Sequence, residues 1–166
     1  MTHIAERTIS TEAQTSLQQG LPQSAAVLAY AGALPLIIAA LLVWLRPSGL
    51  GANAVGFMLV YGGVLIAFFG GVRWGITVMR PDGPSFAGLL GGILPLLIAM
   101  PIFFLDNPNI RFLIIITALP ILLWDDLRAT KRGSGAPDWY LGVRAPLTIL
   151  MTLSFAFAYA QILISG

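Results

Sequence analysis

Five long apolar segments separated by short polar turns constrain this chain more than any other feature. In order, the segments are residues 25–45, 54–79, 86–105, 110–124 with an extension to 127, and 146–164. Crossing a bilayer takes about 20 apolar residues in a helix. Lipid offers no partners to backbone groups, so a spanning segment must satisfy them internally, as a helix does. We therefore predict an all-α fold, an integral membrane five-helix bundle.

The composition agrees with a membrane environment. Of the 166 residues, 57% are hydrophobic and only 10% are charged, whereas a soluble domain has about 25% charged residues. The net charge is only +2 and no basic surface interleaved with aromatic residues is present, which argues against nucleic acid as a partner. The chain has no cysteine and a single histidine, His3. We therefore expect no disulfide, no metal site and no cofactor.

The chain divides into two parts. Residues 1–24 are polar with mixed charge, and they lack the basic start and apolar stretch of a signal peptide. We expect a mobile N-terminal tail at 1–24 and a five-span transmembrane domain at 25–166.

The distribution of lysine and arginine predicts the orientation. With five spans, one side of the membrane holds seven of these residues and the other side two, and cytoplasmic loops carry the excess of positive charge. The N-terminus is then cytoplasmic and the C-terminus outside. The seven are Arg7, Arg73, Arg80, Arg128, Lys131, Arg132 and Arg144, and the two are Arg46 and Arg111.

A group of charged and aromatic residues is predicted at the cytoplasmic interface. Arg73 lies six residues before the end of the second segment, at a depth of roughly 9 Å, and it needs a partner there. Asp125 and Asp126 end the fourth segment on the same side, and Arg144 precedes the fifth. We predict that Arg73 pairs with one aspartate and Arg144 with the other or with backbone carbonyls; the alternative is that all four reach water separately. The aromatic residues of this group are Trp74, Trp124, Trp139 and Tyr140.

Small residues recur at helical spacing in three segments. Lipid supplies no hydrophobic drive between helices, so small residues that allow close backbone approach must hold them together. These stripes contact either other helices of the chain or a partner protein, and the sequence favours the first. The predicted packing residues are Gly56, Gly63, Gly70, Gly71, Gly88, Gly92, Thr148, Thr152, Ala156 and Ala160.

The central part of every segment lacks Asp, Glu, Lys and His. Ion-coupled transporters and proton relays need such groups, so that class of function is disfavoured. Asp125 and Asp126 are adjacent on a helix and point about 100° apart, which makes a shared catalytic or metal site geometrically poor. We therefore predict no catalytic residues and no enzyme.

Four motifs together resemble a family of uncharacterised membrane proteins that includes animal transmembrane protein 69 and bacterial inner-membrane proteins. They are YGGVLIAFFGGVRWGI (61–76), GGILPLLIAMPIFFL (91–105), WDDL (124–127) and PDWYLGVRAPLT (137–148). The resemblance implies a multi-pass protein of the bacterial inner membrane with five helices, and it carries no activity. Asp125 departs from the family pattern, which implies that Asp126 is the better partner for Arg73.

These observations favour a non-catalytic accessory, assembly or scaffold subunit of a membrane complex. The partners would be the lipid bilayer and another membrane protein. The alternative is a protein that binds or passes a small apolar or amphiphilic ligand between proline-kinked helices. An enclosed cavity of about 300 Å³ or more among the helices would favour this alternative.

Overall fold

A computed structural model describes residues 22–45 and 49–165, and all the regular secondary structure in this part of the chain is helical. The helices are α2 (Gln23–Leu45), α3 (Leu50–Val78), α4 (Phe86–Phe104), α5 (Pro108–Lys131) and α6 (Tyr140–Ser165). The predicted all-α bundle of five helices is thereby confirmed. Residues 1–21 of the predicted tail lie outside the described residues, and α2 begins two residues before the predicted boundary at Ala25.

Local chemistry explains where the central helices start. The Ser85 side chain accepts a hydrogen bond from the Gly88 backbone N–H at 3.2 Å and caps α4. The Asn107 side chain caps α5 by accepting a hydrogen bond from the Asn109 backbone N–H at 2.9 Å. Pro108 occupies the first turn of α5, where a backbone N–H has no partner within the helix and its absence has no cost. Polar turn residues therefore define the helix starts that the sequence predicted.

The start of α6 differs from the prediction. The apolar pattern begins at Pro146, a residue type that often opens a helix, but α6 begins six residues earlier at Tyr140 and includes Pro146. Arg144 therefore lies inside the helix, in its second turn, and is buried. The apolar pattern missed this first part because an arginine, Arg144, is buried there beside Val143 and interrupts the apolar run.

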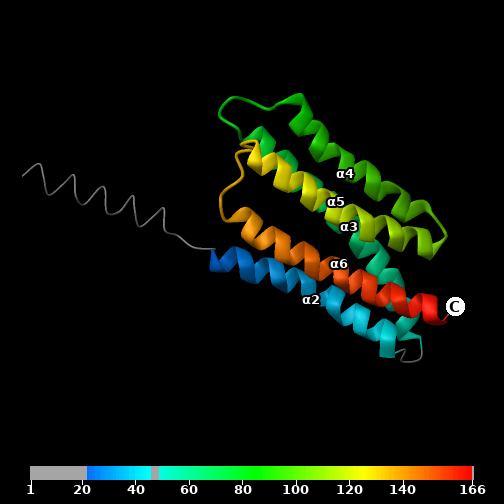
Figure 1. Ribbon diagram of the computed structural model, residues 1–166. Coiled ribbons are helices and arrows are strands. Elements are labelled where there is room, and N and C mark those ends of the chain that lie inside the picture. Colours follow the sequence, from blue (N-terminus) through cyan, green and yellow to red (C-terminus); the bar gives the residue numbers. More distant parts are fainter. Residues whose placement is uncertain (1–21, 46–48, 166) are drawn as a thin grey trace, which may run out of the picture.

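Helix α3 is the centre of the bundle and packs against α2, α4 and α5, while α6 packs against α2 and α5 (Figure 1). The loop between α3 and α4 and the loop between α5 and α6 lie at the same end of the bundle. We call this the basic end, because it carries Arg73, Arg80, Arg128, Lys131, Arg132 and Arg144.

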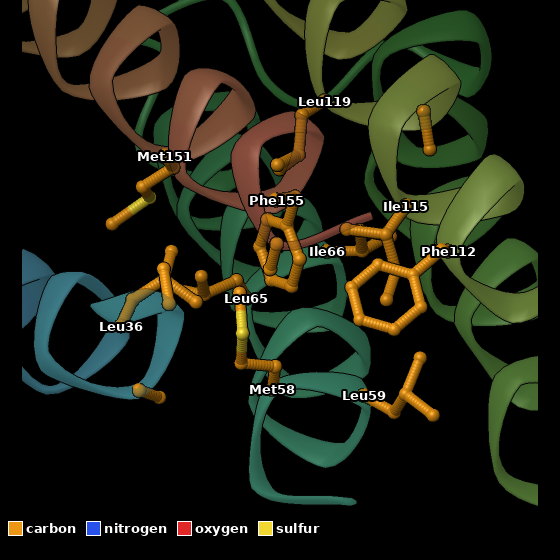
Figure 2. Close-up of a cluster of buried hydrophobic side chains, with 14 of the residues drawn as sticks. Leu36, Met58, Leu59, Leu65, Ile66, Phe112, Ile115, Leu119, Met151 and Phe155 are labelled. Carbon is orange, nitrogen blue, oxygen red and sulfur yellow. The ribbon is translucent and has the colours of Figure 1, made fainter. Parts of the chain in front are cut away.

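The core lies where four of the helices meet. Leu36 of α2, Ile66 of α3, Ile115 of α5 and Phe155 of α6 converge there and are fully buried (Figure 2). The outward faces are also apolar; Leu97 of α4, for example, is 57% exposed. A bundle that is apolar inside and outside is suited to a lipid surround.

Length and composition make four helices fit to cross a membrane: α2, α3, α4 and α6. Helix α5 carries Arg111, Asp125 and Asp126 and is not among them. Its 24 residues extend roughly 36 Å, which exceeds the thickness of the hydrocarbon core. That α5 also crosses the bilayer stays a prediction.

Glycines hold α3 against α4. A Cβ atom added at Gly70 would lie 2.6 Å from the Gly92 carbonyl oxygen, and one added at Gly92 would lie 2.9 Å from the Trp74 Cβ. At Gly63 the added atom would lie 2.6 Å from the Phe103 ring. At Gly70 and Gly92 a side chain would meet backbone, so the two helices approach backbone to backbone there, whereas at Gly63 the Phe103 ring occupies the space.

Gly88 is similarly crowded, with Thr77 at 2.6 Å from an added Cβ, whereas Gly56 and Gly71 have no atom within 4 Å of one. Gly56 precedes Gly63 by two helical turns. Because α4 ends at Phe104, beside Gly63, it does not extend as far as Gly56. Gly71 is turned about 100° away from Gly70. Neither of these two glycines packs against another helix of the described chain.

The predicted stripe on α6 runs from the interior to the surface. Thr148 is buried, Thr152 and Ala156 are half-buried, and Ala160 is exposed. Residues four apart rotate by about 40° around a helix at each step, or about 120° over the whole stripe. The buried face of α6 therefore follows other residues, namely Leu147, Met151, Phe155 and Ala158.

Candidate functional site

An ion-pair network joins three helices at the basic end. Arg73 of α3 donates a hydrogen bond to Asp125 of α5, and its Nη1 also lies 3.7 Å from Asp126 Oδ1. Arg144 of α6 donates from Nε to Asp126 Oδ2 at 3.1 Å. Each arginine therefore has its own aspartate, as the sequence predicted. The two carboxylates diverge around α5 and reach different helices.

The assignment of the aspartates corrects what the family resemblance implied. Asp126 was expected to be the better partner of Arg73, but Asp125 accepts the hydrogen bond from Arg73 and Asp126 accepts that from Arg144. The reason is the depth of the side chains. Asp126 is 9% exposed and faces the buried Arg144, whereas Asp125 is 50% exposed and meets Arg73 at the surface.

Among residues 22–45 and 49–165, Arg144 is the most deeply buried charged residue, with 3% of its surface exposed. Its Nη1 donates to Thr148 Oγ1 at 2.6 Å, and its guanidinium carbon lies 3.4 Å from the centre of the Phe69 ring. Its Nη2 is buried without a hydrogen-bond partner. A buried charge is costly without a partner, so Asp126 is the countercharge that Arg144 needs.

Tyr140 completes this inner pair, because its hydroxyl donates to Asp126 Oδ2 at 3.3 Å. Of the four predicted aromatic residues, Tyr140 alone is hydrogen-bonded to the ion pairs. Trp74, Trp124 and Trp139 are exposed at the basic end, and Trp124 lies under the Arg128 guanidinium at 4.9 Å. Exposed tryptophans at the end of a bundle are typical of the membrane interface.

Two contributors to the network were not assigned that role from the sequence. A Cβ atom at Gly91 would lie 2.7 Å from Arg73 Nε, so this glycine makes room for the guanidinium against α4. Thr148 was predicted as a packing residue and instead binds Arg144. Its spacing of four from Arg144 on a helix could have indicated this contact.

A groove of about 550 Å³ opens between α2, α3 and α6. We call it the apolar groove. Its walls are almost entirely hydrocarbon, with Ala29 of α2, Val64 and Phe68 of α3, and Leu147 of α6 among them. Tyr140 and Arg144 lie at its basic end. No sequence pattern locates this groove, because ordinary apolar residues from three separate segments form it.

The described residues contain no group of three or more His, Cys, Asp or Glu side chains that could hold a metal ion. Arg73, Arg144, Asp125 and Asp126 are engaged with one another instead. Their arrangement fixes the relative positions of α3, α5 and α6 and borders the apolar groove.

Comparison with known proteins places the chain in a family. Residues 21–160 match the family described as "Protein of unknown function (DUF3429)". The chain belongs to this family. The match covers all the described helices except the last few residues of α6, and it includes the whole ion-pair network.

Two relatives of the DUF3429 chain are transmembrane proteins of animals. Transmembrane protein 69 of Xenopus tropicalis is 32% identical over 137 residues, which are 80% of this chain and 52% of the relative. Transmembrane protein 69 of Mus musculus is 28% identical over 137 residues, 81% of this chain and 54% of the relative. The chain thus spans about half the length of these relatives. No solved structure matches. With its apolar helices, the chain is a multi-pass membrane protein.

Proposed function

We propose that this protein binds a small apolar or amphiphilic molecule in the apolar groove between α2, α3 and α6. The volume of about 550 Å³ carries the proposal, because ligand sites in proteins measure roughly 300–1,000 Å³ and are lined mainly by apolar side chains. Its volume exceeds the roughly 300 Å³ expected of a ligand site, but the site is an open groove and not the enclosed cavity that the sequence criterion named.

The walls of the groove are fixed in position. The Tyr61 hydroxyl of α3 donates to the Gly32 carbonyl of α2, and both residues line the groove. At the basic end, the Arg144 guanidinium lies on the Phe69 ring and is anchored to α5 through Asp126. A preformed site spends little free energy on ordering its walls when a ligand enters.

The shape of the groove favours one long chain. Along α6 its lining extends from Tyr140 to Met151, a rise of roughly 17 Å. Apolar residues occupy this length, and polar groups lie at the basic end. An acyl or isoprenoid chain lying along the helices matches this distribution.

The proposal includes a non-catalytic role and a location in the bacterial inner membrane. Asp125 and Asp126 are each bound to a different arginine, which supports a structural use of both carboxylates. The excess of lysine and arginine at the basic end supports a cytoplasmic position for it, in the bacterial inner membrane. An accessory role in a larger complex stays a prediction.

Trp139 lines the groove and provides a direct assay. In a protein whose other three tryptophans are replaced by phenylalanine, a fatty acid brominated along its chain should quench Trp139 fluorescence saturably in detergent. Val64→Phe should reduce this binding, because Val64 lines the groove.

Val60→Phe is the matched control. Val60 lies one turn away on α3 with a similar exposure, 49% against 51%, and is not part of the lining. Quenching that does not saturate, or equal losses in the two variants, would contradict the proposal.

A further inference from the structure

A second hollow, separate from the apolar groove, lies at the basic end where α3 ends, α4 begins and α5 ends. It measures about 170 Å³, and we call it the polar pocket. It shares no lining residue with the groove. The side chains that matter for its chemistry are Arg73, Arg80, Arg132, Asp125, Ser85 and Ser134.

The charge of the polar pocket is positive. Three guanidinium groups line it against a single carboxylate, that of Asp125, which is already hydrogen-bonded to Arg73. Two positive charges therefore remain in excess. Among the described residues, no carboxylate lies within ion-pair distance of Arg80 or Arg132.

The first turn of α4 adds to this positive field. Ala87 and Gly88 line the pocket beside the capping residue Ser85. The N-terminus of a helix carries a partial positive charge and free backbone N–H groups. The fit of Gly88 against Thr77, where an added Cβ would lie 2.6 Å from the threonine, brings this helix start against α3 and so toward the arginines.

Separate parts of the chain hold the arginines around the hollow. Arg73 lies in the last turns of α3, and Arg80 follows that helix, with its Cγ 3.6 Å from the position of a Cβ at Gly135 in the loop before α6. Arg132 caps the end of α5. Guanidinium groups that converge from different elements favour one compact, multiply charged anion over a diffuse surface attraction.

The geometry points to a binding site for a phosphate group in the polar pocket. The planar donor pairs of arginine match the oxygens of phosphate, and a helix N-terminus suits the same anion. The exposed Trp74 and Trp124 are the chain neighbours of the pocket residues Arg73 and Asp125, and exposed tryptophans are typical of the level at which lipid headgroups sit. The ligand is therefore the phosphate of an anionic lipid headgroup, although free phosphate shares the chemistry. This inference does not depend on a ligand in the apolar groove.

The test is the thermal stability of the purified protein in a neutral detergent. Dioctanoyl phosphatidic acid should raise the unfolding temperature saturably, and dioctanoylglycerol, which lacks only the phosphate, should not. Arg80→Gln and Arg132→Gln should each weaken the apparent affinity about fivefold, since one arginine near an anionic lipid surface contributes on that scale.

Arg128→Gln is the matched control, because Arg128 lies at the same end on Trp124 and outside the pocket. It removes the same charge and should leave the affinity unchanged. Inorganic phosphate that stabilises with the same dependence on Arg80 and Arg132 would support the site with free phosphate as the source. An equal loss in Arg128→Gln, or an equal shift with dioctanoylglycerol, would overturn the inference.

Discussion

Replacing Asp126 by asparagine tests whether the ion pair with Arg144 holds the bundle together. The change removes the countercharge of Arg144, whose side chain is only 3% exposed. Breaking a buried pair from one side typically costs about 3–5 kcal/mol. Thr148 and the Phe69 ring remain as partners of the guanidinium, and the ring contributes about 1–2 kcal/mol at most. We expect a loss of about 3 kcal/mol in the free energy of unfolding.

Asp125→Asn is the internal comparison. Asp125 is 50% exposed, so its pair with Arg73 is screened by solvent and should contribute about 1 kcal/mol or less. Reversible unfolding in mixed micelles measures both variants. The neighbouring aspartates are the same residue type and differ in burial and in partners, because Asp126 also accepts a hydrogen bond from Tyr140, so the ratio of the two losses compares the buried network with the exposed pair.

A double-mutant cycle separates the pair from its surroundings. Arg144→Met combined with Asp126→Leu removes both charges and replaces them by apolar side chains, which is often neutral for a buried pair. The double variant should therefore lose less stability than the sum of the single variants. Additive losses, or a loss at Asp125 as large as that at Asp126, would refute the reasoning.

Two further predictions concern packing and the buried arginine. Gly92→Ala should lower the free energy of unfolding by about 1–3 kcal/mol, because its Cβ would meet the Trp74 backbone. Gly71→Ala has open space around it and should change the free energy of unfolding by no more than about 0.5 kcal/mol. Thermal unfolding compares the two variants, and equal effects would contradict the α3–α4 contact. Thr148→Val should lower the free energy of unfolding by about 1–3 kcal/mol, because it leaves Arg144 Nη1 without its acceptor. Thr117→Val, at an exposed position, should lower it by less than about 1 kcal/mol in the same assay.

The five helices could be predicted because each is a long apolar run between turn residues. The meeting of Arg73, Asp125, Asp126 and Arg144 could be predicted as well, since the direction of each segment places them at one end. Which aspartate pairs with which arginine could not be predicted. Adjacent aspartates differ by about 100° around α5, and the rotation of that helix depends on packing that no local pattern records.

Other features depend on which helices are neighbours. Gly70 and Gly71 look equivalent in the sequence, yet one meets the Gly92 carbonyl and the other is open. The early start of α6 was hidden because the buried position at its second turn is Arg144. The apolar groove has no linear signal, since its residues are indistinguishable from those that face lipid.

The side of the membrane on which each loop lies tests the central claim most directly: five crossings, with the ionic network at the cytoplasmic end. The chain has no cysteine, so Asn107→Cys before α5 and Ser134→Cys after it introduce single thiols. The account predicts that a membrane-impermeant maleimide added outside intact cells labels position 107 and leaves position 134 unlabelled until the cells are opened. Labelling of both positions from the same side would show that α5 does not cross the bilayer and would contradict the account.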